Sequence, residues 1–495
     1  MARIADTLTD AGHNVTFLVP VVDEVRRNQL SVKETKDVVL VEQDEEMRRQ
    51  VIPIDDGMSV YWKSDVNSSN MDTIFSAFVD SMRLSCSNFL RNKKVFEEMK
   101  SRNFDVGIFE PLSVCGLGFM HAIGIRKTIT ASSCVFYDAA VEAIGEGDDA
   151  SYVPGQMDRY YGDGLSLLER VENYRITKSL KKLSFEILDR ETEIYQKSLG
   201  QDVPHWRDLM VESSAHFVNS IPYLDFPRTV IQKTVPIGGI SVDLETLKFA
   251  KLPEEWNEVL NRRKYNMLIS FGSLVKSKEM PKKWRQGLLE AIQSLHNVTF
   301  IWKYESDDLS WATGATNIHF SQWVPQTALL SDDRLTAFLT HGGLGSTNEL
   351  AHFGKPALMV PVMGDQARNS HMLARHGGAF VFQRRDLGNV EKVEKAIHEI
   401  LINEKYQKNA KKLAEMLTNI PTKPKEQVVK YVEFVAKFGP FPKMNRSGKR
   451  SGFIERQQLD IFFVIYLPYL AGFVFVMLVF KFIHVRIFVR KLKNQ

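Results

Sequence analysis

Cysteine is scarce in this 495-residue chain, which has only three. Cys86, Cys115 and Cys134 lack the close spacing of zinc ligands, and an odd number leaves one unpaired, so neither a metal site nor a disulfide framework is predicted. An excess of charge of one sign is also missing, because 64 Lys and Arg residues face 60 Asp and Glu residues. The resulting +4 excludes a nucleic-acid binder whose affinity depends on phosphate neutralisation.

Compositional bias is absent too. The chain has 29 Gly and 18 Pro, with 44% hydrophobic and 25% charged residues, which excludes a disordered, collagenous or repeat-array protein. These fractions are typical of a packed globular chain. The length predicts two domains with additional segments.

One long hydrophobic run stands near the C-terminus. Residues 461–480 carry no charge, and as a helix they would span about the 30 Å of a bilayer core. A buried core helix is the weaker alternative, because such helices rarely run this long without a polar face. The tail, residues 481–495, is basic, so the positive-inside rule predicts a cytosolic tail and lumenal domains.

A lumenal protein needs a signal peptide, but the residues after Met1 lack an apolar core and have the pattern of an amphipathic helix. We therefore expect further coding sequence upstream. Glycosylation sequons at Asn67, Asn297 and Asn445 fit a lumenal glycoprotein. The last five residues, KLKNQ, resemble the dilysine retrieval signal of endoplasmic-reticulum membrane proteins, with a solvated basic tail as the alternative.

Helix and strand patterns alternate in two series, which predicts two doubly wound α/β domains with parallel sheets. The first domain covers residues 1–240 and the second residues 265–445, with a polar connection at 241–264. Ligands of such sheets bind at the carboxyl ends of the strands. We expect the site in the cleft between the two domains.

The most informative stretch is residues 320–369. It predicts a strand, then the turn His341-Gly342-Gly343-Leu344-Gly345, and then a helix from Ser346. This stretch suits a diphosphate, because its glycines permit close backbone approach and it offers a helix N-terminus, a hydroxyl and an imidazole. A Walker lysine is missing, and Asn348 occupies the place of the third glycine of a dinucleotide fingerprint.

Other polar residues follow this turn in an order that suits a nucleotide sugar. Glu349 lies one helical turn beyond Gly345 and could accept hydrogen bonds from a ribose. Trp323 offers a stacking face, and Asp365 with Gln366 offers an acceptor and an amide for sugar hydroxyls. Taken singly, Trp323 also fits a core position and Glu349 a solvated helix charge.

This stretch resembles the signature of the UDP-glycosyltransferase superfamily: W-x-P-Q, then H-G-G, S, E, G-x-P and D-Q at matching spacing. Including Phe271-Gly272-Ser273 and the apolar run, the chain resembles the membrane-bound UDP-glucuronosyltransferases along nearly its whole length. The resemblance implies a GT-B fold, in which the C-terminal domain holds a UDP-sugar and the N-terminal domain a small lipophilic acceptor. It implies no metal and no cofactor beyond the UDP-sugar co-substrate.

The resemblance also implies a role for each donor-site residue. The residues are Trp323 and Gln326 at uracil, Glu349 at ribose, Ser273, His341 and Ser346 with Gly343 and Gly345 at the diphosphate, and Asp365 and Gln366 at the sugar. Gly345 departs from the family, which often has Asn there, so only its backbone remains for the phosphates. Glucuronate and glucose stay open as the sugar.

Family catalysis is an inverting displacement, in which an acid orients a histidine that deprotonates the acceptor. Glu110 matches the acid, which is usually Asp. The histidine belongs before the helix that begins near Met1, so its partner is not in this chain. His13 follows that helix, roughly 16 Å from its start.

The missing base leaves three hypotheses. The first is a membrane enzyme whose upstream residues, with signal peptide, central first strand and histidine loop, are absent from this sequence. The second is an inactive short isoform that binds UDP-sugar or pairs with full-length relatives as a homo- or hetero-oligomer. The third is a non-transferase α/β membrane protein. We expect the chain alone to be close to inert, since loss of a general base costs about 10² to 10⁴ in rate.

Overall fold

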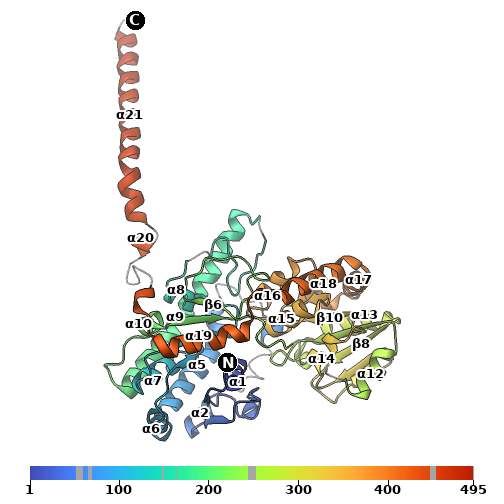
Figure 1. Ribbon diagram of the computed structural model, residues 1–495. Helices are drawn as coiled ribbons and strands as arrows, with labels where there is room; N and C mark the ends of the chain where they lie inside the picture. The colour runs from blue at the N-terminus through green and yellow to red at the C-terminus, as the bar shows by residue number, and fades with distance from the viewer. Residues whose placement is uncertain are drawn as a thin grey trace. The chain divides into compact units, whose positions relative to one another are not determined.

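The computed structural model describes residues 1–51, 60–64, 70–147, 150–162, 164–243, 252–445, 453–456 and 458–493. The chain divides into two compact units, Met1–Met444 and Asn445–Gln495. Three parallel sheets, all in the first unit, account for the strands of the described residues (Figure 1). The first unit therefore holds both α/β series that the sequence predicts.

The C-terminal half of the first unit contains a six-stranded sheet with the order β12-β11-β10-β7-β8-β9. The strands are β7 (Tyr265–Ser270), β8 (Val298–Lys303), β9 (Ile318–Ser321), β10 (Ala337–Thr340), β11 (Ala357–Met359) and β12 (Ala379–Val381). From β7 the chain first adds strands on one side and then, from β10, on the other. The switch point between β7 and β10 is where a sheet of this kind binds its ligand.

Both faces of this sheet are covered, because successive side chains of a strand point to opposite sides. In β7, Met267 and Ile269 join one core and Leu268 the other. One face packs against α13 (Lys282–Ser294) and α17 (Val390–Ile402). The other packs against α12 (Glu254–Asn261), α14 (Gln326–Ser331), α15 (Leu344–Phe353), α16 (Gln366–Ala374) and α18 (Glu404–Thr418).

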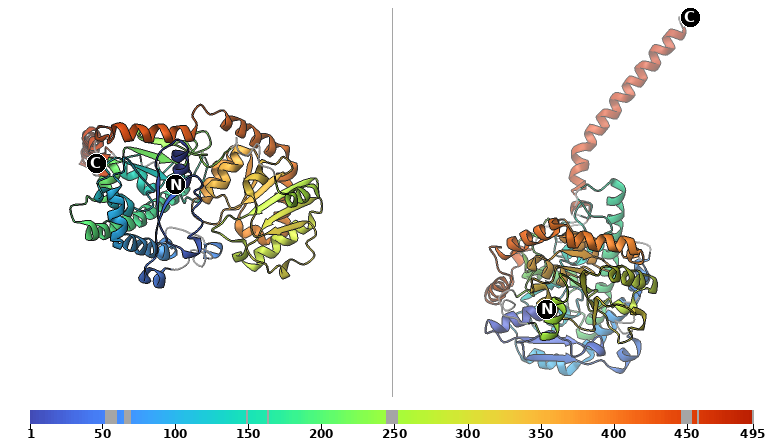
Figure 2. Two further views of the ribbon diagram at one scale, coloured as in Figure 1. Left: turned by 60° about the horizontal axis from the view of Figure 1, so that its bottom comes forward. Right: turned by 90° about the vertical axis from the view of Figure 1, so that its right-hand side faces the viewer.

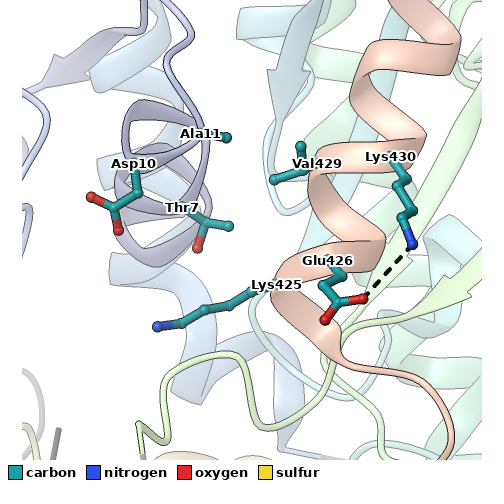
Figure 3. Close-up of a pocket in the computed structure, with 7 residues that line it drawn as sticks. All are labelled: Thr7, Asp10, Ala11, Lys425, Glu426, Val429 and Lys430. Carbon is teal, nitrogen blue, oxygen red and sulfur yellow. Dashed lines mark ion pairs between the residues drawn. The ribbon is translucent and has the colours of Figure 1, made fainter. Parts of the chain in front are cut away.

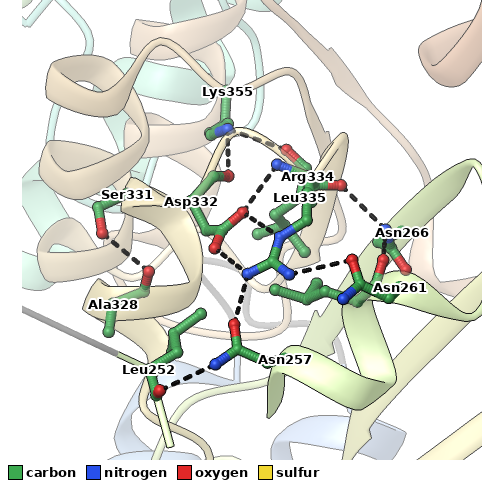
Figure 4. A network of polar contacts seen from close by, with 11 residues as sticks. Leu252, Asn257, Asn261, Asn266, Ala328, Ser331, Asp332, Arg334, Leu335 and Lys355 are labelled. Atoms are coloured by element: carbon green, nitrogen blue, oxygen red, sulfur yellow. Dashed lines mark hydrogen bonds and ion pairs between the residues drawn. The ribbon is translucent and has the colours of Figure 1, made fainter. Parts of the chain in front are cut away.

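A polar network fixes the end of this sheet that lies opposite the switch-point loops (Figure 4). Arg334, before β10, donates to both carboxylate oxygens of Asp332 and to Asn257 of α12 at 2.8 Å. Lys355 donates to the backbone carbonyls of Asp332 and Leu335. Helix α12 is thus tied to the sheet.

The N-terminal half has two separate parallel sheets. A four-stranded sheet has the order β3 (Gly107–Phe109), β4 (Thr128–Ser132), β5 (Ala215–Val218), β6 (Thr234–Pro236), and a pair is formed by β1 (Thr16–Pro20) and β2 (Asp37–Val41). Among the described residues, β1 and β3 share no ladder. Arg102, before β3, links the two sheets by donating to Thr16 and to Asp37.

The four-stranded sheet is also covered on both faces. One face packs against α1 (Ala2–Asp10) and α19 (Pro424–Phe438), which lies over this half (Figure 2). The helices on the other side are α5 (Met71–Arg91), α6 (Lys93–Ser101), α7 (Cys115–Ala122), α9 (Leu167–Leu199) and α10 (Trp206–Glu212). Shorter helices in this half are α2 (Glu45–Gln50), α4 (Val60–Lys63) and α8 (Asp138–Ala143).

The predicted boundaries differ from the structure in two places. The polar connection 241–264 contains α12, because Trp256, Val259 and Leu260 recur at helical spacing and are buried against the second sheet. Helix α19, predicted as part of the C-terminal domain, packs instead on the N-terminal half through Val428, Val432 and Val435. The two halves belong to one compact unit, so the division into domains stays a prediction.

The cysteines form a bond that the sequence did not reveal. Cys86 of α5 and Cys115 of α7 form a disulfide, with Cα atoms 5.6 Å apart, and Cys134 is free. The pair is separated by 29 positions in sequence, so only the packing of α5 on α7 brings the two together. The expectation that no disulfide can be assigned is therefore corrected.

The second unit contains α20 (Phe453–Arg456) and α21 (Leu459–Lys493). Residues Leu459–Arg490 are long and apolar enough to cross a membrane, and none of their most apolar stretch is buried in the protein. The predicted span, 461–480, lies inside this helix. The helix continues through the predicted basic tail as far as Lys493.

Of the three sequons, that at Asn67 lies outside the described residues, and that at Asn445 is described only at the asparagine. At the third, Asn297 is exposed, whereas Thr299 is buried in β8. Glycosylation stays a prediction.

Candidate functional site

The loops after β7 and β10 lie side by side at the switch point of the six-stranded sheet. His341 follows β10, and its imidazole fills the space above Gly272 and Gly343: a Cβ atom at these glycines would lie 2.6 and 2.7 Å from the ring. Gly272 also has a φ of 84°, which favours glycine. The glycines therefore make room for His341. Ser273, next to Gly272, is exposed at the same edge.

His341 is buried and uncharged near neutral pH. Burial lowers its pKa to about 4, and the positive charge of Lys303 acts in the same direction. Its contribution to a diphosphate site is therefore a neutral imidazole hydrogen bond. The nearby cation is Lys303, which is buried, donates to the carbonyl oxygen of Gly272 at 2.7 Å and pairs with Glu305 at 3.2 Å.

Lys303 is a site residue that the sequence analysis missed. The available signal was its place at the carboxyl end of β8, where ligand-binding residues of parallel sheets gather. Its Nζ also lies 5.9 Å from the centre of the Trp323 ring. A cation thus lies between the imidazole and the aromatic side chain.

Helix α15 begins at the glycine turn, where the sequence predicts the diphosphate. Gly343 is the N-cap residue, and no side chain caps the first turn. The first amides of a helix lack intrahelical acceptors and carry the positive end of its dipole. Gly345 is exposed with open space where a side chain would start, and Ser346 is partly buried beside it.

Four side chains meet beside this helix start. Gln326, at the start of α14, donates to Glu349 at 2.5 Å and to Ser346 at 3.0 Å, and Thr327 donates to the other Glu349 oxygen at 2.6 Å. Burial raises the pKa of Glu349, and the Thr327 and Gln326 hydrogen bonds oppose this shift. The interpretation as a solvated helix charge is therefore wrong.

Trp323 is not part of the core, because 73% of it is exposed. Its carbonyl oxygen accepts a hydrogen bond from Ser321 at 2.6 Å, which fixes the backbone of the loop before α14. The ring is thus an exposed aromatic face in the loop that precedes α14. The structure brings together the predicted uracil, ribose and diphosphate residues.

Asp365 and Gln366 lie at the start of α16, after β11. Gln366 is buried, and its carbonyl oxygen accepts from the backbone N–H groups of Val362 and Met363 at 2.9 Å each. The side-chain amide nitrogen of Gln366 therefore points away from the turn at Val362 and Met363. Burial raises the pKa of Asp365, whose carboxylate accepts from Asn369 at 2.9 Å.

Glu110 follows β3 in the N-terminal half. One of its carboxylate oxygens accepts from the backbone N–H of Ser133 at 3.1 Å, from the Ser133 hydroxyl and from Tyr137 at 2.6 Å. The Cys134 thiol lies beside Tyr137 and Asp365, and burial together with the negative charge of Asp365 raises its pKa. The segment 133–137 therefore joins the predicted acid to the predicted sugar residue of the other half.

The start of α1 lies beside Glu110. Burial lowers the pKa of the Met1 amino group, and the negative charge of Glu110 opposes this shift. His13 lies past the other end of the helix, where its Nε2 is 3.2 Å from Glu433 of α19. Among the described residues, no histidine hydrogen-bonds Glu110; its side-chain donors are Ser133 and Tyr137.

Glu191 of α9 supports the loop that carries Glu110. It accepts from Ser113 at 2.9 Å and from the backbone N–H of Val114 at 2.7 Å, at the start of α7, where Cys115 forms its disulfide. Burial raises its pKa to about 7, although these hydrogen bonds oppose the shift. An acid in a highly charged 33-residue helix gives no sequence signal of this role.

Two cavities lie away from the donor residues. The larger, about 340 Å³, is a groove between α1 and α19 lined by Thr7, Asp10, Ala11, Lys425, Glu426, Val429 and Lys430 (Figure 3). The smaller, about 30 Å³, is lined by residues from Phe136 to Gly155 together with Thr177, Lys181, Arg228 and Thr229.

A doubly wound donor half, facing a second α/β half that presents a carboxylate, defines a glycosyltransferase of the GT-B class. The chain is similar to the glycotransferase of kitacinnamycin, with a TM-score of 0.59 and 15% identity over 88% of this chain and 95% of that chain. It is also similar to the glycosyltransferase VinC, solved in complex with DTDP, with a TM-score of 0.57 and 16% identity over 89% and 96% of the two chains. The predicted GT-B fold is confirmed.

The chain belongs to the family described as UDP-glucoronosyl and UDP-glucosyl transferase, whose model matches residues 1–495. Its relatives include ugt-48 and ugt-55 of Caenorhabditis elegans, both with UDP-glucuronosyltransferase names. The ugt-48 protein is 26% identical over 93% of this chain and 87% of its own length. The ugt-55 protein is 30% identical over 85% of this chain and 80% of its own length. UDP-glucuronosyltransferase 1A9 of Mus musculus is 26% identical over 93% and 85%. The chain is therefore a member of a glycosyltransferase enzyme family that uses UDP-sugars.

Proposed function

We propose that this protein transfers a glucuronosyl or glucosyl group from a UDP-sugar to a hydroxyl of a small lipophilic acceptor, with inversion and without a metal. The observation that carries the proposal is the junction at Cys134. There the loop that holds Glu110 meets Asp365, the predicted sugar residue. An acceptor activated near Glu110 would thus be next to the sugar of a donor bound in the other half.

The proposed binding of the UDP-sugar rests on charge and hydrogen-bond donors at the diphosphate. A diphosphate needs counter-charge or hydrogen-bond donors, and the uncapped start of α15, the His341 imidazole and the buried Lys303 supply these without a metal. The Gln326–Glu349 pair would then open toward the ribose and uracil. In the structure these side chains hydrogen-bond one another.

The transfer step is a single displacement. The acceptor oxygen attacks the anomeric carbon from the face opposite UDP, the bond between that carbon and the phosphate oxygen breaks, and UDP leaves with the electron pair. The hydroxyl proton passes to a base that Glu110 orients. Ser133 and Tyr137 occupy one Glu110 oxygen, so the other oxygen is the one available to the base. Burial raises the pKa of Tyr137, which keeps its hydroxyl a donor.

Membrane placement forms a further part of the proposal. Helix α21 would anchor the protein in the endoplasmic-reticulum membrane, with unit 1 in the lumen and the basic end in the cytosol. The Cys86–Cys115 disulfide supports an oxidising compartment. If the terminal lysines act in retrieval, changing Lys491 and Lys493 to Ser should release the protein to later compartments. Unchanged residence by microscopy would assign retention elsewhere.

The test is UDP release by the detergent-solubilised full chain, incubated with UDP-glucuronate or UDP-glucose and a phenolic acceptor. In a chain extended at its N-terminus with the first strand and histidine loop of a family relative, we expect Glu110→Gln to lower the transfer rate by about 10² with unchanged UDP affinity, because the acid orients the base and does not touch the donor. The anomeric configuration of the product, read by NMR, should be opposite to that of the donor. Retention of configuration would contradict the proposal.

A second function, UDP-sugar binding without turnover, is favoured by one observation: no histidine of the described residues hydrogen-bonds Glu110. Under this function the chain binds UDP-sugar but releases no UDP above the rate of hydrolysis in buffer. The same assay separates the two functions. Adding a full-length relative would show whether the chain changes the relative's rate.

A further inference from the structure

Arg368 is a fully buried cation on the helix that begins with the predicted sugar residues. It lies one turn after Asp365 on α16, and only 1% of it is exposed. Its guanidinium reaches out of the C-terminal half: Nη2 lies 2.8 Å from Asp225, and Nε donates to the carbonyl oxygen of Pro154 at 3.1 Å. Both partners belong to the N-terminal half.

Aromatic rings enclose the same guanidinium. The rings of Phe136 and Phe226 have their centres 4.9 and 5.3 Å from it. Phe136 belongs to the segment 133–137 that carries Ser133 and Tyr137, the residues that hold Glu110. Arg368 is therefore in contact with the segment that orients the acid as well as with the helix that bears Asp365.

The ion pair has a fixed geometry on the N-terminal side. Asp225 accepts from the Ser220 hydroxyl at 2.7 Å and from the backbone N–H of Phe226 at 2.7 Å, so its carboxylate cannot move freely. A second contact of α16 with this half is the stacking of His371 on Tyr161, with ring centres 4.3 Å apart. The start of α16 is thus held against the N-terminal half.

A buried ion pair seldom adds net stability, because desolvation offsets much of its attraction, so its retention calls for another role. The contacts of Arg368 suggest one: it determines where the start of α16 lies relative to segment 133–137. The residues predicted for UDP lie on other elements. Gln326 is on α14, Glu349 is on α15, and neither hydrogen-bonds Arg368.

We propose that Arg368 is a positioning residue for the sugar. Through its contacts with Asp225 and Phe136 it fixes Asp365 and Gln366 beside the loop of Glu110, and it acts on the sugar part of the donor without affecting the UDP part. The inference rests on the proposed function. It goes beyond that function in assigning the position of the sugar to contacts between the two halves.

The experiment is isothermal titration of the solubilised full chain with UDP and with UDP-glucose or UDP-glucuronate, whichever the wild type binds more tightly. The ratio of the two dissociation constants isolates the contribution of the sugar. The double variant Arg368→Met with Asp225→Asn removes both charges and avoids leaving one buried charge unpaired. We expect its sugar contribution to fall about tenfold while its UDP affinity stays within twofold of wild type.

Arg368→Lys keeps the charge but loses the planar set of guanidinium donors, so we expect the sugar contribution to fall about threefold. This variant tests the inference if the double variant does not fold. The matched control is Arg375→Met. Arg375 is the C-cap residue of the same helix, donates to the Asp225 carbonyl at 3.3 Å and lies 4.9 Å from the centre of the Phe226 ring, but it is exposed and at the other end of the helix from Asp365. We expect no change in its ratio.

Two results would overturn the inference. An equal loss of UDP and UDP-sugar affinity in the variants would mean that Arg368 is only structural, and an unchanged ratio would mean that the sugar is positioned without it. Failure of the wild type to bind UDP at all is a different result. It would overturn the proposed function and, with it, the inference.

Discussion

The two halves of unit 1 differ in how their sites are built. In the C-terminal half, the donor residues lie in short loops and helix starts that border one continuous six-stranded sheet. In the N-terminal half, the sheet is in two parts, and Glu110 is held by Ser133, Tyr137 and, indirectly, Glu191 from distant elements. The residues of a site at one sheet edge can be predicted from the sequence, whereas the residues of a site assembled from several distant elements cannot.

The largest expected effect tests the N-terminal half. Glu191→Gln should alter the pH dependence of stability, because the pKa of Glu191 is raised to about 7 from 4.5. Between these values the folded state binds a proton that the unfolded state does not, so the wild type loses stability as pH rises through this window. The loss should total about 3 kcal/mol, on the order that a shift of this size implies.

Denaturant unfolding at several pH values measures this effect. The variant loses a constant amount of unfolding free energy at every pH, because its hydrogen bonds to Ser113 and Val114 are weaker. It lacks the pH-dependent loss of stability that the wild type shows. Its free energy of unfolding relative to wild type should therefore rise between pH 4.5 and 7 and be flat above. Parallel curves for the two proteins would contradict the role of burial at Glu191.

The next prediction tests the C-terminal half. Gly272→Ala should destabilise the protein by about 2 kcal/mol, because the new Cβ would meet His341 at 2.6 Å and φ is 84°. UDP affinity should fall at least tenfold as the imidazole is displaced. Gly116→Ala is the control, since nothing lies within 4 Å of its Cβ position and it belongs to α7 of the N-terminal half. Equal effects at the two glycines would show that the imidazole does not lie where the account requires.

A smaller effect is expected at Gln326. Replacement by Ala removes the donor to Glu349 and Ser346, and UDP affinity should fall about five- to tenfold, as for the loss of one hydrogen bond to a charged or polar partner. The control is Gln322→Ala in the same loop, where the amide donates to Asp307 at 2.6 Å. Calorimetry on both variants measures the difference. Unchanged affinity at Gln326→Ala would remove it from the site.

Much of the donor site could be predicted because its residues follow one another closely in sequence. The stretch from Trp323 to Gln366 runs through α14, β10, the glycine turn, α15 and β11 to the start of α16, and these consecutive elements also fix which residues meet. The roles of Lys303 and Arg368 could not be predicted in this way. Each depends on side chains that come from elements far apart in the chain, such as Gly272 for Lys303 and Asp225 for Arg368.

The same reason explains the errors at the level of the fold. Helix α19 has an apolar stripe that any sheet face could bury, and the sequence cannot show that the face lies in the other half. The disulfide between Cys86 and Cys115 depends on the packing of α5 against α7. The order of helices and strands, in contrast, follows from hydrophobic periodicity, which is local, and the GT-B fold was predicted from it together with the family resemblance.

The central claim is that a glycine turn, an uncapped helix start and a neutral histidine bind the diphosphate of UDP. Titration of UDP into the full chain, with a chelator present, tests it most directly, using His341→Ala and His352→Ala as a matched pair. His352 is also partly buried on α15, but its Nδ1 hydrogen-bonds the carbonyl of Asn348. We predict metal-independent UDP binding that His341→Ala weakens at least tenfold and His352→Ala leaves nearly unchanged. Binding that requires magnesium, or equal losses in both variants, would contradict the account.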